Sequence, residues 1–392
     1  MTPDAILDQV LIPRPNGSEG LERVAAFIAA TLERAGAQVS LEPFSATPHG
    51  FQLVWSAALL LMLGTSAAIL LRRYGVALAL TGLTASLLLV EFELLRSPVS
   101  GLLPATENNI VGSFPGHANG PTLIFCAHYD TTTHFGDHLS WGTWGWRQGP
   151  ATGLAILLAL AGLWLQKRGR SLPRAPTLLA AVLIPVPFAA FFWFQTVGPL
   201  VRAPSPGAID NGGSVSALLL LSEQLASRPP DAPTTVKLVF LAAEEERAMG
   251  SWAYASSLDR DAPVVVINLE SIGAADALAY VAEDGFALRR YQSPEPVIRF
   301  VNDTAREIWG AELPARELPV GTLTDARSFL AHGVPALTLR AFTEDPFPRK
   351  LHSADDDRER LSIPALERGA RFLRALVAHA DAARSRLDAR PG

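Results

Sequence analysis

The stretch TLIFCAHYD, residues 122–130, is an apolar run that ends in two polar side chains spaced two residues apart. Short uncharged runs of this kind are typical of strands buried in a parallel sheet, and open α/β sheets bind ligands at the carboxyl ends of such strands. The spacing places His128 and Asp130 on one face, so Asp130 could fix the tautomer of a metal-binding His128. A structural histidine at a strand end is the simpler alternative.

Two further apolar runs also end in acidic residues. TTVKLVFLAAEE, residues 234–245, ends in Glu244 and Glu245, and APVVVINLE, residues 262–270, ends in Glu270. Of two adjacent glutamates, one can bind a metal ion while the other accepts a proton from a water on that ion. A solvated acidic run at the start of a helix, where the helix dipole favours acids, is the alternative.

The remaining candidate ligands lie in two loops. PGAIDNGGS, residues 206–214, places Asp210 directly before a predicted helix, where a carboxylate can bridge two cations or simply cap the helix. LHSADDD, residues 351–357, carries His352 before the last predicted helix. Two histidines and three carboxylates form the mixed nitrogen and oxygen set that suits zinc, with manganese and cobalt as alternatives.

Four apolar segments predict that the chain enters a membrane. Hydrophobic residues make up 49% of the 392 residues and charged residues only 18%. The segments are Phe51 to Leu71, Gly75 to about Val90, Ala151 to Leu165, and Ala175 to Val201, which contains Pro185 and Pro187. The first is long enough to cross a bilayer, the third is the weakest, and a buried soluble helix is the alternative for each. Together they predict two transmembrane hairpins, over residues 51–95 and 150–201.

Basic residues in the short connections predict the orientation of these spans. One connection carries Arg72 and Arg73, and the other carries Lys167, Arg168, Arg170 and Arg174. Short loops rich in lysine and arginine stay in the cytoplasm, so the rest of the chain is expected outside it. MTPDAILDQVLIPRPNGSEG, residues 1–20, lacks the pattern of a signal peptide. The expectation is a multi-pass protein of the cell membrane with about four spans and an extracytoplasmic domain.

The segments outside the spans predict a discontinuous α/β domain over residues 1–46, 104–140 and 204–392. Strand and helix patterns alternate in them, which favours a mixed, mostly parallel central sheet with helices on both faces. Helices are expected over residues 213–227, 294–309 and 361–385. The net charge of −5 and the lack of long basic runs argue against nucleic acid as a partner.

These segments resemble the co-catalytic zinc peptidases of the M28 type, which include bacterial leucyl aminopeptidase, aminopeptidase Y and glutamate carboxypeptidase. AHYD resembles the family's His-x-Asp strand end, GAIDNGGS its bridging-aspartate loop, AAEEERAMGS its paired glutamates, and HSADD its final histidine motif. GTLTDARSFLAHGVPALTL, residues 321–339, resembles the segment before that histidine. The resemblance covers essentially all of the predicted α/β domain, including the helix that begins in GSEGLERVAAFI. It implies the zinc-exopeptidase fold.

The resemblance also implies a role for each candidate residue. One of two zinc ions would be held by His128, Asp210 and Glu270, and the other by Asp210, Glu245 and His352. Glu244 would be the general base for a water activated by the metal ions, and Asp130 would orient His128. The implied activity is that of an exopeptidase, first of all an aminopeptidase, and the expected substrate is a peptide close to the bilayer.

Two positions depart from the pattern of most soluble members. Glu270 stands where they have aspartate, which resembles the multi-pass members of the endoplasmic reticulum and vacuole. Ala326 follows Asp325 where many members have histidine, which puts a substrate contact there in doubt. Two other interpretations stay open: a peptidase-like membrane module without activity, and a single-zinc enzyme that resembles glutaminyl cyclase.

The loop THFGDHLSWGTWGWRQG, residues 133–149, bears on where the site faces. Trp141, Trp144 and Trp146 could form an interfacial aromatic belt, a lid over the site, or ordinary core packing. His134 and His138 could offer alternative ligands, although surface histidines are the simpler interpretation. An aromatic belt would place the metal site at the membrane surface.

Overall fold

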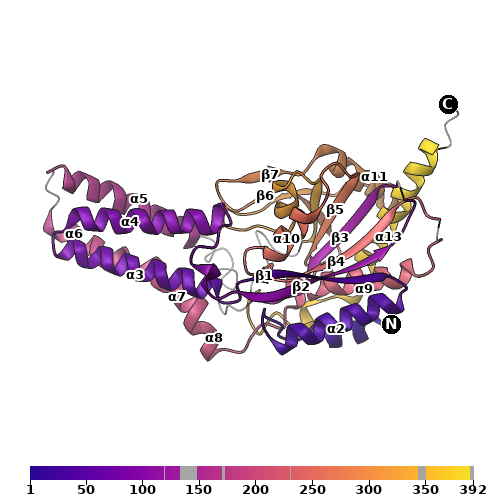
Figure 1. The fold of residues 1–392 in the computed structure, drawn as a ribbon, viewed down its shortest axis with the longest axis horizontal. Helices are drawn as coiled ribbons and strands as arrows, with labels where there is room; N and C mark the ends of the chain where they lie inside the picture. Colours follow the sequence, from indigo (N-terminus) through magenta and orange to yellow (C-terminus); the bar gives the residue numbers. More distant parts are fainter. Residues whose placement is uncertain (119, 133–147, 170–172, 230, 343–349, 389–392) are drawn as a thin grey trace.

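The computed structural model describes residues 1–118, 120–132, 148–169, 173–229, 231–342 and 350–388. In these residues an α/β domain holds a mixed nine-stranded sheet, and a bundle of apolar helices projects from one end of the domain (Figure 1). In chain order the strands are β1 (Gln38–Ala46), β2 (Ala105–Phe114), β3 (Thr122–His128), β4 (Thr235–Leu241), β5 (Val264–Glu270), β6 (Leu278–Gly285), β7 (Arg290–Gln292), β8 (Ala315–Glu317) and β9 (Ala336–Ala341).

The centre of the sheet is parallel and its flanks are antiparallel. The strand order is β1-β2-β4-β3-β5-β9-β6-β7, with β8 paired to β6. Strands β4, β3, β5 and β9 run parallel, whereas β1 with β2, β2 with β4, and β9 with β6 pair antiparallel. The first bundle helices connect β1 to β2 and return the chain to the same edge, so these two strands must be antiparallel. The prediction of a mostly parallel sheet therefore describes only its centre.

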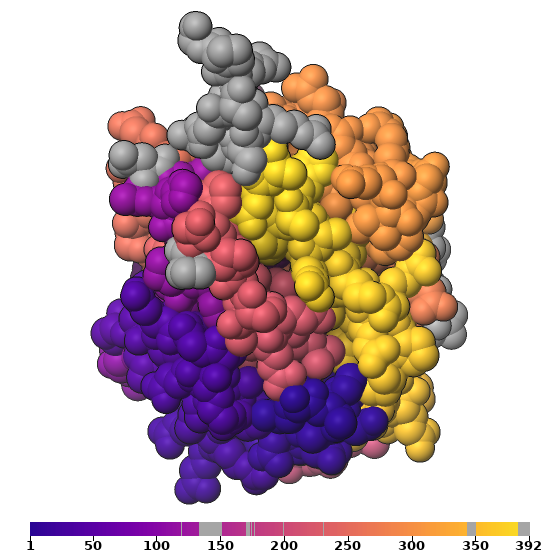
Figure 2. Space-filling model, turned by 90° about the vertical axis from the view of Figure 1, so that its right-hand side faces the viewer, coloured from indigo at the N-terminus to yellow at the C-terminus, as the bar shows by residue number. Residues whose placement is uncertain are grey.

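Helices cover both faces of the sheet. One face packs against α1 (Pro3–Val10), α2 (Glu19–Arg34), α9 (Gly213–Leu225), α11 (Glu295–Trp309) and α13 (Ile363–Asp388). The other carries α10 (Met249–Ser257) and α12 (Ala326–Ala331). Figure 2 shows the end away from the bundle, where α13, in yellow, lies beside α9 and the indigo N-terminal helices. The helices predicted over residues 213–227, 294–309 and 361–385 are α9, α11 and α13, with boundaries that differ by at most three residues.

Helix α2 illustrates how the sequence produces these elements. Ser18 caps the helix by accepting a hydrogen bond from Leu21 N, as serine commonly does at this position. Leu21, Val24, Ile28 and Leu32 recur at helical spacing and are fully buried. The apolar stripe therefore sets which side of α2 packs on the sheet.

The bundle contains the four predicted apolar segments. They are α3 (Gly50–Leu70); α4 (Tyr74–Leu88) continued by the π-helix η1 (Leu89–Glu93); α5 (Gln148–Lys167); and the broken run α6 (Arg174–Leu183), α7 (Val186–Phe192), the π-helix η4 (Trp193–Val197) and α8 (Gly198–Val201). Three helical stretches, Gly50–Leu70, Tyr74–Glu93 and Thr177–Val197, are long and apolar enough to cross a membrane. Within the described residues the third segment offers the shorter apolar helix Ala151–Lys167, in line with its weaker pattern.

The turn between the first two bundle helices and the ends of the next two lie at the far end of the bundle. Figure 1 places the turn between α3 and α4, the C-terminal end of α5 and the N-terminal end of α6 at the end away from the domain. Ile69, Ala77, Leu163 and Ala181 from all four segments pack together near this end. The described basic residues Arg72, Arg73, Lys167 and Arg174 therefore belong to the same end of the bundle.

Candidate metal centre

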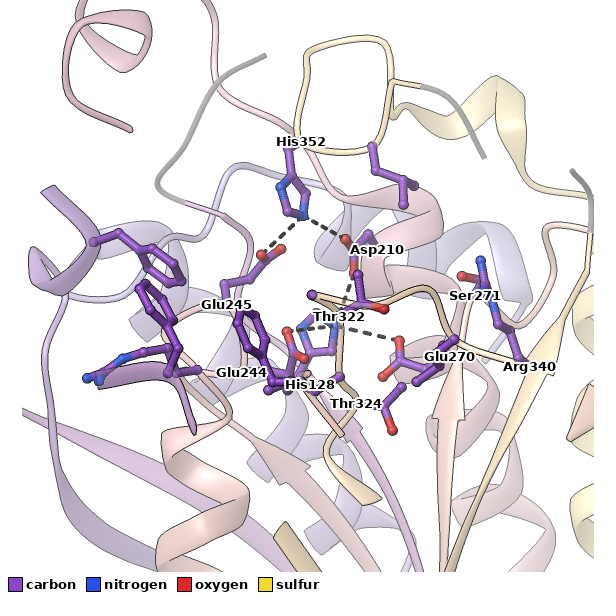
Figure 3. Close-up of a pocket in the computed structure, with 18 of the residues that line it drawn as sticks. His128, Asp210, Glu244, Glu245, Glu270, Ser271, Thr322, Thr324, Arg340 and His352 are labelled. Carbon is purple, nitrogen blue, oxygen red and sulfur yellow. Dashed lines mark hydrogen bonds and ion pairs between the residues drawn. The ribbon is translucent and has the colours of Figure 1, made fainter. Parts of the chain in front are cut away.

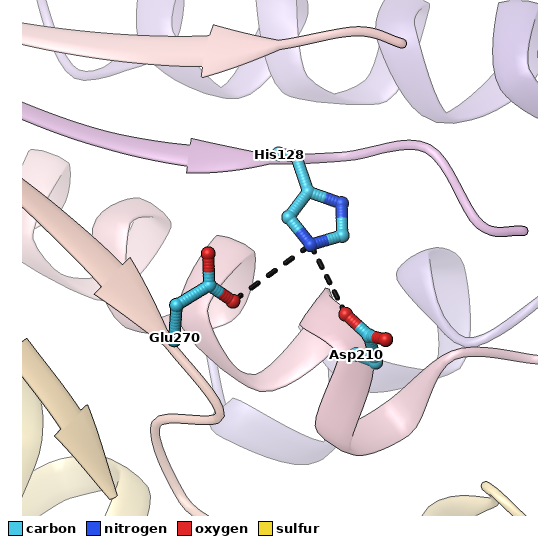
Figure 4. Close-up of side chains that lie close together, drawn as sticks. All are labelled: His128, Asp210 and Glu270. Carbon is cyan, nitrogen blue, oxygen red and sulfur yellow. Dashed lines mark hydrogen bonds and ion pairs between the residues drawn. The ribbon is translucent and has the colours of Figure 1, made fainter. Parts of the chain in front are cut away.

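The five predicted ligands come together at the carboxyl ends of the central strands (Figure 3). They form two groups that share Asp210, and the possible ligand atoms of each group lie within 4.8 Å of one another. One group is His128, Asp210 and Glu270 (Figure 4), and the other is Asp210, Glu245 and His352. Strands β3, β4 and β5 supply or directly precede three of these residues, because neighbouring parallel strands end at one edge.

The spacing of these atoms fits two metal ions that share a bridging carboxylate. Asp210 Oδ1 lies 3.1 Å from His128 Nε2, and Asp210 Oδ2 lies 3.1 Å from His352 Nε2. His128 Nε2 to Glu270 Oε2 is 3.8 Å, and His352 Nε2 to Glu245 Oε2 is 3.2 Å. Zinc binds such atoms at about 2.0–2.2 Å with tetrahedral geometry, which separates two ligands by roughly 3.3 Å.

The Asp210 loop is held by a second aspartate and by glycines. Asp356 accepts hydrogen bonds from Ile209 N at 2.9 Å and Asp210 N at 3.2 Å. A Cβ on Gly213 would lie 2.0 Å from Ile272 O, so helix α9 can begin this close to the end of β5 only with glycine. This contact explains Gly213, and a Cβ on Gly212 would lie 2.7 Å from Gly207 O.

Asp130 orients both the histidine and the two glutamates. Its Oδ1 lies 3.5 Å from His128 Nδ1, which leaves Nε2 of the ring for a metal ion. Its carboxylate also accepts hydrogen bonds from the backbone N–H groups of Glu244 and Glu245, both at 3.2 Å, and from Asn16 Nδ2 at 3.0 Å. The predicted contact with His128 is present, whereas its role in holding the glutamate loop was not predicted.

The glutamate loop has an unusual backbone. Ala243, Arg247 and Ala248 all have positive φ angles, of 56°, 73° and 58°. Such angles are uncommon outside glycine and gather at functional sites, where the surroundings must hold them in place. Gly250 lies in the first turn of α10, directly after the loop, and a Cβ there would lie 2.1 Å from Ala242 O, which accounts for the glycine in AAEEERAMGS.

Glu270 is fixed by two asparagines. Asn211 Nδ2 donates to Glu270 Oε2 at 3.0 Å, and Asn268 Nδ2 donates to Glu270 Oε1 at 3.1 Å. Asn211 Oδ1 also accepts a hydrogen bond from Ser271 N, and Asn211 Nδ2 donates one to Leu269 O. Asn211 therefore joins the Asp210 loop to the end of β5. The longer side chain of glutamate, compared with aspartate, is thus held within reach of His128.

The electrostatics of the centre favour cations. Burial is the main cause that raises the pKa of Glu245 to about 7 and that of Glu270 to about 8, and nearby carboxylates add to both shifts. Burial would lower the pKa of His128, but Glu244, Asp130 and Asp210 together raise it well above its usual value. Without metal ions these groups therefore retain protons, which bound cations would replace.

Glu244 belongs to neither ligand group. Its Oε2 lies 4.0 Å from His128 Nε2, and burial raises its pKa well above the usual value, helped by Asp325 and Glu245. It lines a cavity of about 150 Å³ together with the ligands (Figure 3). A carboxylate that is close to the metal ligands, but not one of them, is placed to accept and release a proton.

Arg14 is a buried cation behind the centre that the sequence analysis missed. Its guanidinium donates to Tyr129 O at 2.6 Å, Pro206 O at 2.6 Å and Gly207 O at 3.1 Å, and it is fully buried. Burial lowers its pKa to about 10, against the attraction of Asp130. Arg14 therefore ties the end of β3 to the Asp210 loop, and its position in LIPRPNG gave little signal of this.

Two sequence expectations around the centre have different outcomes. Ala326 is buried in the core between α12 and the sheet, so its side chain makes no contact with the cavity. Its neighbour Asp325 is fully buried, and burial raises the pKa of Asp325 to about 7. The tryptophan and histidine loop, residues 133–147, lies outside the described residues.

A family model covers most of the candidate centre. The model of peptidase family M28 matches residues 194–377, somewhat less than half of the chain. This range begins after most of the bundle and contains Asp210, Glu244, Glu245, Glu270 and His352, whereas His128 and Asp130 precede it. No curated protein sequence matches the chain.

Solved structures share the fold of the whole domain. A Zn-dependent exopeptidase from Parabacteroides distasonis is similar with a TM-score of 0.54 and 14% identity, and covers 96% of each chain. A glutaminyl cyclase from Porphyromonas gingivalis is similar with a TM-score of 0.56 and 13% identity, and the match covers 97% of this chain and 98% of the cyclase. An aminopeptidase from Aneurinibacillus sp. strain AM-1 is similar with a TM-score of 0.55 and 14% identity, and the match covers 96% of this chain and 93% of the aminopeptidase. The mixed α/β fold is thus one that zinc-dependent exopeptidases and glutaminyl cyclases have.

Proposed function

We propose that the chain is a zinc-dependent exopeptidase of the M28 type, an aminopeptidase anchored in a membrane by its helical bundle. The observation that carries the proposal is the pair of ligand groups that share Asp210, with Glu244 beside them and outside both. The family match over residues 194–377 supports it. The fold shared with a Zn-dependent exopeptidase and an aminopeptidase agrees with it.

The chemistry follows from the roles of the side chains. When bound, two zinc ions would polarise a peptide carbonyl and make a water more acidic, and the five ligands would hold them. Glu244 accepts a proton from the attacking water and returns it to the leaving amine. Asp130 keeps the His128 ring and the backbone of Glu244 and Glu245 in place. The protein thus supplies the proton carrier and its alignment.

The choice of an aminopeptidase rests on the solved structures that share the fold, which include the aminopeptidase from Aneurinibacillus sp. strain AM-1. In this proposal Glu270 is a metal ligand and Glu244 carries the proton, so neither carboxylate is assigned to the α-amine of the substrate. The comparison of free and N-acetylated substrates therefore tests this choice directly.

The placement in the cell membrane rests on the surface of the bundle. Large apolar side chains there, including Leu60, Leu71, Leu157 and Val182, are more than 60% exposed. Exposed apolar surface of this extent marks a membrane or protein interface. The turn between α3 and α4 and the adjoining ends of α5 and α6 lie at the far end, which would be cytoplasmic, and the α/β domain would then be extracytoplasmic.

A glutaminyl cyclase is the second candidate, because cyclases such as the enzyme from Porphyromonas gingivalis have this fold. The full-length protein in detergent separates the candidates through its zinc content and its products. Two zinc ions per chain and hydrolysis of leucine p-nitroanilide, but not of its N-acetylated form, support the aminopeptidase. One zinc ion and cyclisation of an N-terminal glutamine with release of ammonia support the cyclase. Zinc-free protein inactive on both substrates identifies a non-catalytic module.

The general base has its own test. Glu244→Gln should keep both zinc ions and lower kcat by about 10²- to 10⁴-fold, because the proton carrier is lost and the ligands are intact. Glu367→Gln, at an exposed position on α13, is the matched control and should leave both quantities unchanged. A Glu244→Gln enzyme with nearly the original rate would show that another group carries the proton.

A further inference from the structure

The cavity at the metal centre adjoins a second cavity between the domain and the bundle. The second cavity has a volume of about 380 Å³, within the range of ligand sites. The two cavities share five lining residues, so they lie side by side, and we call the second one the junction cavity. The shared residues are Phe51, Phe92, Gln195, Phe286 and Gly321.

The wall of the junction cavity is mostly aromatic and aliphatic. Trp55 of α3 stacks on Phe191 of α7 with ring centres 4.1 Å apart, and Phe92 of η1 stacks on Phe286 at 5.4 Å. Leu88, Ile156 and other apolar residues complete the wall. The bundle therefore offers an apolar surface that begins directly beside the metal ligands, where the substrate is cut.

Two polar atoms in this wall lack partners in the described residues. Gln195 Oε1 and Trp55 Nε1 are buried and without a hydrogen bond, and their side chains are only 3% and 6% exposed. Unsatisfied buried groups of this kind are costly and rare, so each would gain from a ligand group of opposite character once a side-chain rotation turns it toward the cavity. A peptide backbone provides both, with N–H groups for Gln195 and carbonyl groups for Trp55, whereas a hydrocarbon chain provides neither.

We infer that the substrate is an apolar peptide whose large side chains, next to the residue that is removed, occupy the junction cavity. Peptides of membrane-spanning segments have this chemistry. The inference rests on the proposed function, because it places the cut bond at the metal centre. It adds a specificity that the metal centre alone does not have, and assigns the bundle a part in substrate binding.

The test compares two peptides with the same first residue and the same soluble tail, Leu-Phe-Leu-Ser-Lys and Leu-Ala-Ala-Ser-Lys. Burial of each large side chain should raise kcat/KM for the apolar peptide by about 10- to 100-fold over the alanine peptide. The dissociation constants of the two peptides are then measured with the zinc-loaded Glu244→Gln protein, and their ratio should show the same preference. Equal rates and equal binding would overturn the inference and leave the exopeptidase intact. Absence of hydrolysis of both peptides would overturn the proposed function, and the binding ratio would still test the junction cavity.

A filling substitution tests the location of the apolar subsite. Gly153 of α5 lines the junction cavity, and a Cβ there meets no described atom within 4 Å, so Gly153→Phe adds bulk without a clash at its base. The variant should lower the ratio of kcat/KM for the apolar peptide to kcat/KM for the alanine peptide by at least about 10-fold. Gly82→Phe on α4 is the matched control, because a Cβ at Gly82 is equally free and Gly82 lies outside the lining of this cavity. An unchanged ratio in Gly153→Phe would place the apolar subsite elsewhere.

The unpaired acceptor gives a second, independent variant. Gln195→Leu keeps the size of the side chain and removes the amide, so it should weaken binding of the apolar peptide by about 3- to 10-fold. The Tm of the empty protein should hold or rise, because a buried group without a partner is removed. A lower Tm with unchanged peptide binding would show that Gln195 has a structural role only.

Discussion

Two buried acidic sites in this molecule are neutralised in opposite ways. At the base of the bundle, Glu91 of η1 is fully buried and pairs with Arg247 at 2.7 Å, and Ser100 donates to it from both its N–H and its hydroxyl. At the metal centre, the described ion pairs of Asp210, Glu245 and Glu270 are with histidines alone. The bundle junction contains its own cation, whereas the centre needs cations from outside.

The two sites are neighbours in the chain. Arg247 follows Glu245 by two residues, and both belong to the loop with positive φ angles. Arg247 holds this loop to the bundle, and Asp130 holds it to the end of β3. Glu93, the last residue of η1, accepts hydrogen bonds from Leu288 N and Arg289 N beside the junction cavity. The bundle is therefore attached to the elements that shape the active site, and each attachment can be broken separately.

The largest effect is expected at the junction. Arg247→Met leaves Glu91 buried without its cation, which typically costs about 3–5 kcal/mol, and should lower the Tm of the zinc-loaded protein strongly. The double variant Glu91→Gln with Arg247→Met should regain most of the loss. Arg358→Met, which breaks an exposed pair with Asp4, is the control and should cost about 1 kcal/mol or less. If the double variant were no more stable than the single one, the pair would not explain the junction.

The sequence predicted the metal centre better than the junction for a physical reason. Four of the five ligands end or follow an apolar strand or stand in a short loop with glycines, so local pattern and sheet geometry together bring them to one edge. Glu91 and Arg247 are far apart in the chain, and LVEFE looks like the polar end of a membrane span. Which distant cation meets such a carboxylate depends on how the bundle docks, which local periodicity does not encode.

The same limit applies to the supports of the site and to the sheet. Asn16, Asp356 and Arg14 act through backbone groups of loops from other parts of the chain, so residue type alone gives little signal for them. The antiparallel pairing of β1 with β2 depends on where the inserted helices return the chain, which strand patterns do not contain. The parallel centre was predictable because its strands are uniformly apolar and separated by helices.

A middle-sized effect is expected at Asp130, which serves the centre without being a ligand. Asp130→Asn keeps the size of the side chain but weakens the hold on His128 and the glutamate loop, so zinc affinity should fall by about 10- to 100-fold. Competition with a chelator of known affinity measures it. Asp8→Asn on the exposed side of α1 is the control and should have no effect. Unchanged zinc affinity would mean that the ligands hold their positions without Asp130.

The smallest effect has opposite signs at the two sites. Burial raises the pKa of Glu270 to about 8 from 4.5, so the metal-free fold loses stability as the pH rises between these values. Glu270→Gln removes this penalty, and in chelator at pH 9 it should stabilise the protein by about 1–2 kcal/mol, with little difference at pH 4.5. Glu91→Gln should destabilise the protein at pH 9, because Arg247 then lacks its counter-charge. Thermal unfolding of both variants at pH 4.5 and pH 9 measures the two changes in stability. With zinc present, Glu270→Gln should be less stable than the original protein, because the variant lacks one of the zinc ligands. A stabilised Glu91→Gln, or a Glu270→Gln destabilised in chelator, would contradict the view that only the junction is neutralised from within.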